Sequence, residues 1–320
     1  MRNDNILYVV IPCYKEEAVL PETARRLGDK LRQLISRGVI SPQSRALFVN
    51  DGSKDRTWEI IQSLHEGDHL FSGVNLSRNR GHQNALLAGL MTAVDCADVT
   101  VSMDADLQDD IDAMDRMLEA YHDGCDVVYG VRSSRKTDSF FKRFTAEAFY
   151  RLMNGMGVDI VFNHADYRLM SRRAVQGLRE FSEVNLFLRG IVPLIGFKST
   201  TVEYERAPRF AGESKYPLKK MLAFAMDGIT SFSVKPLKLI LSLGIILCLI
   251  GVVMLIALLI GGMDRVGFTM CSVWLVGGLQ LFALGVIGEY IGKIYGESKH
   301  RPRFIIERVI NDENYREMER

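Results

Sequence analysis

Short apolar runs alternate with amphipathic segments over the first 130 residues. The apolar runs have the length of buried strands and lie at 6–11, 45–49, 70–76, 99–103 and 127–129. Apolar positions recur at helical spacing in the segments between them, at 18–36, 55–65, 82–94 and 110–122. Short strands separated by helices predict an α/β domain, Rossmann-like, with a mainly parallel sheet covered by helices on both faces.

The pattern changes after Lys238, the last charged residue before an uncharged run at 239–263. A second uncharged run follows at 266–288. Each run is long enough to cross a hydrocarbon core of about 30 Å as a helix. Lysines and arginines flank the pair and the turn holds only Asp264 and Arg265, so the positive-inside rule predicts that both ends face the cytoplasm. We predict a two-helix transmembrane hairpin, with a pair of buried core helices as the alternative.

These patterns divide the chain into five segments. We predict a cytoplasmic domain at 1–216, an interfacial amphipathic helix at 217–234, transmembrane helices at 235–263 and 266–290, and a basic cytoplasmic tail at 291–320. A further amphipathic stretch at 140–156 is predicted either to lie on a bilayer or to pack on its own domain. The expected location is the inner (cytoplasmic) membrane.

Composition narrows the function classes. The net charge is +1, from 40 Lys and Arg against 39 Asp and Glu, and the basic residues are interspersed with acids. We therefore expect no nucleic-acid partner. The five cysteines are widely spaced and form no C-x-x-C, which argues against a disulfide framework and a zinc site. A polar start at residues 1–5 leads directly into the first strand, so we expect no signal peptide.

Polar segments follow three of the predicted strands, at 12–17, 50–55 and 104–108. Ligands of parallel sheets bind outside the carboxyl ends of the strands, so these segments predict a single site. No G-x-G-x-x-G follows the first strand and no G-x-x-x-x-G-K-[ST] occurs, which disfavours a dinucleotide-binding domain and a P-loop NTPase.

The acidic pair Asp104 and Asp106 is the main candidate for chemistry at this site. Two carboxylates brought together by a turn, with Gln108 as a neutral oxygen donor, suit Mg²⁺ or Mn²⁺. Such an ion neutralises a leaving diphosphate as a Lewis acid. The alternative is a solvated turn or a helix cap. Asp51 is a candidate for hydrogen bonds to a base or ribose, with a turn residue in Asn-Asp-Gly as the alternative.

Three segments, Ile11–Glu17, Val49–Asp55 and Asp104–Gln108, resemble the signature of family 2 glycosyltransferases with the GT-A fold. Further motifs resemble the polyprenyl-phosphate branch of that family, which includes bactoprenol glucosyltransferases and, more distantly, dolichol-phosphate mannose synthase. They are Asn79–Ala85, Ala165–Met170, Arg209–Tyr216 and Gly288–Tyr295. The resemblance covers nearly the whole chain and is specific for the branch but only weakly for the sugar.

The resemblance implies a role for each matching position. The positions that would hold the nucleoside are Pro12, Tyr14, Glu16 and Asp51. The metal would be held by Asp104, Asp106 and Gln108. Arg209 and Lys215 would contact phosphates, and Arg132 would meet the acceptor phosphate. Asp166 matches an acidic position of the branch and would orient the acceptor or a sugar hydroxyl, with a helix or turn cap as the alternative.

The implied reaction is inverting transfer of a hexose from a UDP-sugar to undecaprenyl or another polyisoprenyl phosphate. Glucose is the first choice, with GlcNAc and galactose open. A processive polysaccharide synthase would need more membrane spans and a Q-x-x-R-W motif, and neither Trp58 nor Trp274 has that context. A non-enzymatic membrane adaptor or flippase subunit is the third reading. Glycines in the hairpin suggest a possible homo-oligomer; they are Gly244, Gly251, Gly277 and Gly278.

Overall fold

The computed structural model describes residues 4–133, 164–184, 186–206, 230, 233, 235–260, 265–311 and 316–317. The chain forms two compact units. The sheet unit comprises Met1–Glu147, Ile160–Lys215 and Pro302–Arg320. The hairpin unit comprises Ala148–Asp159 and Tyr216–Arg301.

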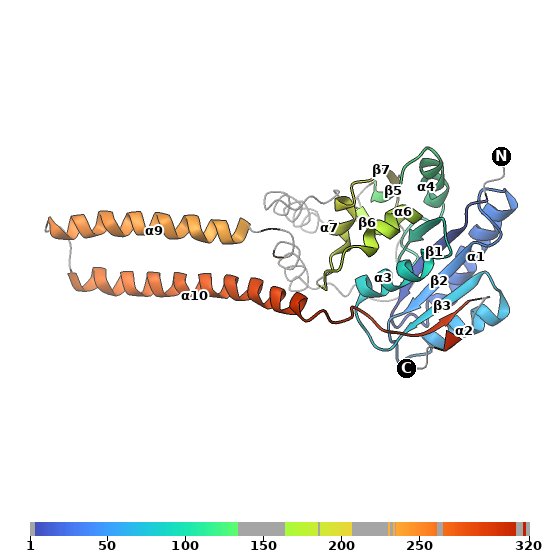
Figure 1. Ribbon diagram of the computed structural model, residues 1–320, viewed down its shortest axis with the longest axis horizontal. Coiled ribbons are helices and arrows are strands. Elements are labelled where there is room, and N and C mark those ends of the chain that lie inside the picture. Colours follow the sequence, from blue (N-terminus) through green and yellow to red (C-terminus); the bar gives the residue numbers. More distant parts are fainter. Residues whose placement is uncertain are drawn as a thin grey trace. The chain divides into compact units, whose positions relative to one another are not determined.

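A nine-stranded sheet is the centre of the sheet unit (Figure 1). Its strands, in spatial order, are β7 Ser199–Tyr204, β5 Val127–Arg132, β6 His164–Ser171, β4 Val99–Ser102, β1 Leu7–Cys13, β2 Arg45–Asn50, β3 Phe71–Leu76, β8 Ile306–Ile310 and β9 Arg316–Glu317. The four strands from β4 to β3 are parallel to one another, and β5 is parallel to β7. These parallel pairs confirm the predicted α/β architecture with a mainly parallel sheet.

Helices cover both faces of this sheet (Figure 1). They are α1 Leu20–Ser36, α2 Thr57–Gly67, α3 His82–Ala93, α4 Ala113–His122, α6 Arg172–Arg179 and α7 Leu188–Leu194. Alternate residues of β1, such as Leu7 and Val9, share one core with the apolar sides of α1, α2 and α4. Val10 points to the opposite face, where α3 packs so closely that a Cβ on Gly89 would lie 2.3 Å from it. The period-two pattern of a strand thus sets the two layers.

Four strands of the sheet, β6, β7, β8 and β9, were not predicted from the sequence. β6 enters between β4 and β5, antiparallel to both, and β8 pairs antiparallel with β3. The first residues of the segment predicted as a basic tail, 291–320, belong to α10, and residues 306–310 extend the sheet; the placement of this segment in the cytoplasm stays a prediction. An ion pair holds the start of β5 to α6, because Asp126 accepts from Arg173 Nε at 2.5 Å and from Ser171 Oγ at 2.8 Å.

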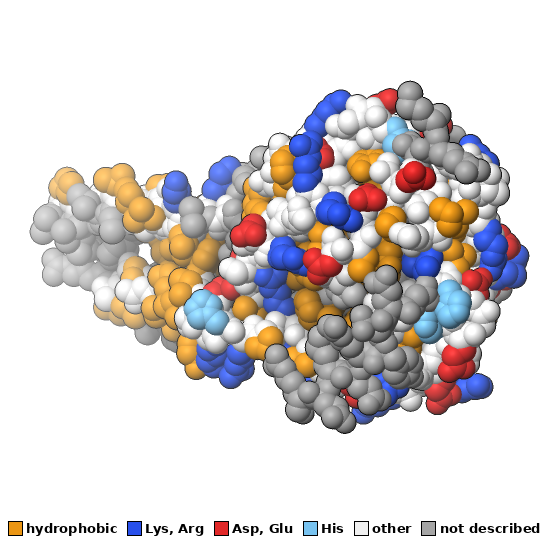
Figure 2. All heavy atoms as spheres, turned by 45° about the vertical axis from the view of Figure 1, so that its right-hand side comes forward, with side chains coloured by type: hydrophobic (Ala, Val, Ile, Leu, Met, Phe, Trp, Pro, Cys, Tyr) orange, Lys and Arg blue, Asp and Glu red, His pale blue; other side chains and the backbone are white. Residues whose placement is uncertain are grey.

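The hairpin unit consists mainly of α9 Lys235–Leu259 and α10 Arg265–Ser298, which lie side by side (Figure 1). Many of their large apolar side chains are exposed (Figure 2), among them Leu241, Leu249, Val273 and Leu281, each more than 60% exposed. Gly244, Gly277 and Gly278 would have no neighbour within 4 Å of an added Cβ, so they do not form a close contact within this pair.

The predicted membrane segments have mixed outcomes. Within the residues that the structure describes, we find no helix with the length and apolar character needed to cross a bilayer. The two transmembrane spans are therefore not confirmed. Helices do occupy both ranges. α10 continues to Ser298, eight residues beyond the predicted end at 290. The predicted interfacial stretches at 140–156 and 217–234 lie outside the described residues, apart from 230 and 233.

Candidate active site at the carboxyl ends of the strands

The loops that follow β1 and β2 are joined by hydrogen bonds. Asp51 donates its backbone N–H to the carbonyl of Cys13 at 2.9 Å, and the Lys15 N–H donates to Ser53 Oγ at 3.0 Å. Glu16 donates its N–H to Thr57 Oγ1 at 3.1 Å. The structure thus brings together the first two polar segments, as the strand order predicts. Pro12 is buried beside them, while Tyr14 is 44% exposed at the rim.

Asp51 has a structural task that the sequence did not predict. Its side chain is 2% exposed, and its two oxygens accept the backbone N–H groups of Arg80 and Gly81 at 2.6 and 2.9 Å. Burial raises the pKa of this carboxyl, while the two backbone donors oppose that rise. Asp51 therefore holds the 78–81 loop against the carboxyl end of β2, in addition to any role toward a nucleoside.

The acidic pair lies on a tight turn directly after β4. Leu107 is buried and has φ of +58°, a left-handed conformation that is uncommon for a residue with a branched side chain. This turn lets Asp106 accept the Gln108 N–H at 3.2 Å. The Ala105 carbonyl accepts a hydrogen bond from Thr23 Oγ1 at 2.8 Å, which fixes the turn to α1. The turn that the sequence required is therefore present.

His82 joins two of the predicted carboxylates. It is the first residue of α3, and its Nε2 lies 3.5 Å from Asp104 Oδ1 and 3.6 Å from Asp166 Oδ2. Burial lowers the pKa of His82, but the hydrogen bond to Asp166 and the charge of Asp104 outweigh it and raise the pKa to about 9. A cationic imidazole therefore stands between the acidic pair and Asp166. His82 entered the sequence analysis only as part of the Asn79–Ala85 motif and was assigned no role there.

Asp166 is the centre of an ion-pair network. Arg189 of α7 donates to its two oxygens from Nε and Nη2 at 3.1 and 3.2 Å, and Arg168 Nη2 lies 3.8 Å away. Although burial favours the neutral acid, the charge of Arg189 and the bond from His82 hold the pKa of Asp166 well below its usual range. Asp166 is therefore a fixed carboxylate and a poor proton acceptor. Arg189 gave no signal in the sequence, because it stands alone in an apolar segment.

The far side of the acidic turn carries a further acid, Asp109. It is buried and accepts Tyr204 OH at 2.5 Å. Burial and the charge of Asp104 raise its pKa to about 6, while Arg132 opposes the rise. Arg132 ends β5 opposite Tyr204, so the structure does bring it to the acidic turn. Arg209 and Lys215 lie outside the described residues.

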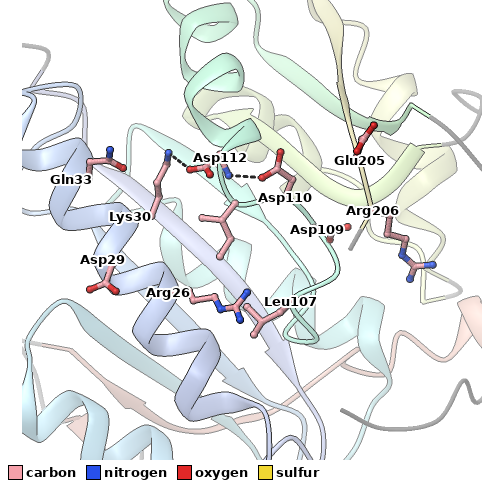
Figure 3. Close-up of a pocket in the computed structure, with 11 residues that line it drawn as sticks. Arg26, Asp29, Lys30, Gln33, Leu107, Asp109, Asp110, Asp112, Glu205 and Arg206 are labelled. Carbon is pink, nitrogen blue, oxygen red and sulfur yellow. Dashed lines mark hydrogen bonds and ion pairs between the residues drawn. The ribbon is translucent and has the colours of Figure 1, made fainter. Parts of the chain in front are cut away.

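A cavity of about 840 Å³ opens beside this turn, between α1 and the 107–112 segment (Figure 3). Charged side chains of both signs line it, including Arg26, Lys30 and Arg206, with Lys30 held by Asp112 at 2.7 Å. The cavity reaches Leu107 but its lining includes neither residue of the acidic pair. It therefore adjoins the predicted site without coinciding with it.

The donors suit a divalent cation that is shared with a substrate. Among the residues that the structure describes, no group of three or more His, Cys, Asp or Glu side chains is arranged to hold a metal. The set offered is the two carboxylates plus Gln108, whose Oε1 already accepts a bond from Arg206. Mg²⁺ commonly takes one or two carboxylates and completes its shell with water and phosphate oxygens. The negative charge of Asp104 and Asp106, which raises the pKa of Asp109, is what such an ion would neutralise.

Comparison with known proteins gives two matching family models. Residues 8–179 match the model of the family described as Glycosyl transferase family 2, and residues 235–294 match the GtrB C-terminal hairpin. An uncharacterized glycosyltransferase of Bacillus subtilis (strain 168), YkoT, is 48% identical, with 98% of this chain and 95% of that protein covered.

Two named relatives are similar over almost their full length. The bactoprenol glucosyl transferase of Shigella phage SfV is 39% identical, with 93% of this chain and 97% of the relative covered. The prophage bactoprenol glucosyl transferase homolog of Escherichia coli (strain K12) is 38% identical, with 94% and 98% covered.

Proposed function

Because the chain belongs to glycosyl transferase family 2 and is a hexosyltransferase, we propose that it transfers glucose from UDP-glucose to a polyprenyl phosphate. The names of the two bactoprenol glucosyl transferase relatives support the sugar and the acceptor. The match to the GtrB C-terminal hairpin supports the same branch of the family. The UDP carrier is part of the proposal and rests on resemblance alone.

The observation that carries the proposal is the position of the acidic pair. Asp104 and Asp106 follow β4 at the edge of the sheet where the β1 and β2 loops also end, and His82 connects them to Asp166. One edge therefore offers loops for a nucleoside, carboxylates for a cation and a charged network for the reacting groups. A bound Mg²⁺ or Mn²⁺, held by the two carboxylates, would neutralise the charge that develops on the departing diphosphate.

In the proposed reaction an oxygen of the acceptor phosphate forms a bond to the anomeric carbon. The bond from that carbon to the diphosphate oxygen breaks, its electron pair leaves with the nucleotide, and the configuration inverts. A phosphate monoester has its second pKa near 6, so the attacking oxygen is already deprotonated at neutral pH. No residue has to remove a proton. This agrees with the low pKa of Asp166, which suits it to orienting a partner and not to general-base catalysis.

We further propose that the enzyme acts at the cytoplasmic membrane, with the sheet unit in the cytoplasm. The exposed apolar side chains of α9 and α10 require an apolar environment, and a lipid layer is the one in which a polyprenyl phosphate resides. The chain leaves the sheet unit before α9 and rejoins it at β8, so both ends of the helix pair belong on one side. Homo-oligomer formation stays part of the proposal.

The test uses membranes that contain the full chain, incubated with a panel of labelled nucleotide sugars with and without undecaprenyl phosphate. We expect lipid-extractable label from UDP-glucose only when the acceptor is present, and loss of that product after removal of divalent cations. Asp104→Asn should reduce transfer at least about 100-fold, the size of effect typical of lost electrostatic stabilisation. Asp29→Asn, an exposed change on α1, is the matched control. Undiminished transfer by Asp104→Asn would instead favour the adaptor or flippase reading.

A further inference from the structure

The last strand of the sheet reaches the site through an irregularity in its pairing. β8 runs antiparallel to β3, with Asn75 opposite Arg308 and Leu76 opposite Ile306. Glu307 is therefore the extra residue of a β-bulge. Bulges redirect a side chain out of the regular alternation of a strand. Here the Glu307 carboxylate reaches Asn75, whose Nδ2 donates to Oε2 at 2.8 Å.

From Asn75 a series of hydrogen bonds leads to the loops at the strand ends. Asn50 Nδ2 donates to Asn75 Oδ1 at 2.7 Å, and the Ser53 N–H donates to Asn50 Oδ1 at 3.2 Å. The Lys15 N–H in turn donates to Ser53 Oγ at 3.0 Å. The series crosses β8, β3 and β2 and ends in the loop after β1. Its ends are 292 residues apart in the sequence, from Lys15 to Glu307.

The groups at the two ends of the asparagine pair fix the orientation of both amides. An ionised carboxylate can only accept, so Asn75 must turn its amide nitrogen toward Glu307 and its oxygen toward Asn50. Asn50 is 2% exposed, and the Ser53 N–H, which can only donate, requires the Asn50 oxygen on its side. The donor-only Ser53 N–H and the acceptor-only Glu307 carboxylate therefore require the same amide orientations from opposite ends of the pair. Bonds aligned in one direction strengthen one another, so loss of the Glu307 acceptor weakens the support of Asn75 and Asn50.

The series ends in the loops after β1 and β2, which are the loops assigned to the nucleotide. Lys15 has φ of +58°, a conformation of higher energy for a residue with a side chain, and its N–H is held by Ser53. The neighbours of Lys15 are Tyr14 and Glu16, and Asn50 directly precedes Asp51. Weaker support of Asn50 would loosen the Ser53 backbone N–H, and Ser53 is the residue whose Oγ holds the Lys15 N–H.

We propose that Glu307 is a positioning residue for donor-nucleotide binding, acting through Asn75 and Asn50 on the loops after β1 and β2. This inference rests on the proposed function, because it takes those loops to hold the nucleotide. Glu307 touches no substrate. Its role is to keep the nucleotide loops in their binding conformation before the donor arrives.

The experiment compares Glu307→Ala and Glu307→Gln in the full chain, with Glu119→Ala, an exposed change on α4, as the matched control. Steady-state transfer from UDP-glucose to undecaprenyl phosphate gives KM for the donor and kcat. Losing one hydrogen bond of ordinary net strength predicts a rise of about three- to tenfold in donor KM for Glu307→Ala, with kcat nearly unchanged. Glu307→Gln keeps an acceptor oxygen and should restore a donor KM within about twofold of wild type.

Two further measurements separate this role from a general structural effect. Amide hydrogen exchange of the free enzyme should increase in peptides covering 13–17 and 50–54 for Glu307→Ala, and not for the Glu119→Ala control. The double variant Glu307→Ala/Asn75→Ala should be no worse than Asn75→Ala alone, because both changes interrupt one series.

The inference is overturned if Glu307→Ala leaves donor KM and loop exchange at wild-type values. It is also overturned if Glu307→Ala and Glu307→Gln are equally impaired, since the role depends on an acceptor oxygen. A wild-type enzyme that transfers no sugar would refute the proposed function separately. In that case the exchange measurement on the two loops still decides the inference.

Discussion

Replacement of Asp51 offers a direct measure of how the site is held together. Its buried carboxylate accepts the backbone N–H groups of Arg80 and Gly81 at 2.6 and 2.9 Å. Asp51→Ala removes both acceptors and leaves two partly buried N–H groups without them. Asp51→Asn keeps one acceptor oxygen but turns an amide nitrogen toward one of the donors. The two variants should therefore differ in stability, with Ala the more damaging.

The size of the effect follows from the number of bonds. A hydrogen bond to a charged group contributes about 1.5–3 kcal/mol. Asp51→Ala, which loses two, should lower the free energy of unfolding of the sheet unit by about 3–6 kcal/mol, and Asp51→Asn by about half of that. Asp29→Asn, an exposed change on α1, should stay within about 0.5 kcal/mol of wild type.

The assay uses tryptophan fluorescence during urea unfolding of the full chain. Trp58 lies in α2 and packs against the core of the sheet unit, whereas Trp274 lies in α10. A Trp274→Phe background therefore leaves Trp58 as a reporter of the sheet unit alone. All Asp51 variants and the Asp29→Asn control are compared in that background.

A loss below 1 kcal/mol for Asp51→Ala would refute the reasoning. It would mean that the 78–81 loop finds other acceptors, and that Asp51 has no structural role. Equal losses for Asp51→Ala and Asp51→Asn would contradict the bond count in a different way, since they would show that the remaining acceptor oxygen of Asn contributes nothing.

Three further predictions test other contacts. Hydrogen bonding to Arg173 lowers the pKa of Asp126 in the folded state. The stability that the Asp126 carboxylate contributes is therefore present above its unfolded pKa and is lost as pH falls through its folded pKa. The difference in urea stability between wild type and Asp126→Asn should close below about pH 4. An added Cβ on Gly52, which has φ of +60°, would lie 2.4 Å from the backbone carbon of Arg78, so Gly52→Ala should lower the melting temperature and weaken donor binding. Arg189→Gln removes the bidentate partner of Asp166 and should lower kcat about 10- to 100-fold while circular dichroism is unchanged.

Each of these has its own control and contrary outcome. A stability gap for Asp126→Asn that stays constant from pH 7 to 3 would rule out the ion-pair explanation. Wild-type melting of Gly52→Ala would mean that the 78–79 backbone can move away. Arg179→Gln, an exposed arginine on α6 bonded to Asp95, serves as the control for Arg189→Gln. Equal kcat values for Arg189→Gln and Arg179→Gln would show that Arg189 does not contribute to the site.

Sequence periodicity predicted the elements that are formed by local pattern. β1, β2, β3 and β4 are short and mainly apolar, and apolar positions recur at helical spacing in the segments between them, so each element can be recognised from its own local sequence. The acidic pair was singled out for the same reason, because it directly follows such a strand. The strands that were missed have no such pattern: β6 carries His164, Asp166 and Arg168 within eight residues.

The contacts of the site could not be predicted in the same way. His82 and Asp166 are 84 residues apart, and Arg189 lies on another helix, so only the completed sheet brings them together. Asp51 was singled out as a candidate for nucleoside binding, which stays a prediction, whereas its bonds to the backbone of Arg80 and Gly81 depend on the packing of two loops. The pairing of β8 with β3 likewise depends on the path of the chain after α10, and the local sequence of β8 does not predict that path.

The return of β8 also has a consequence for biosynthesis. β3 is made early, yet the strand that covers its open edge emerges from the ribosome only after both long helices have been translated. An unpaired edge strand is a template for aggregation. Nascent chains halted before residue 306 should therefore depend on chaperones, because the β3 edge stays open until residues 306–310 have been synthesised.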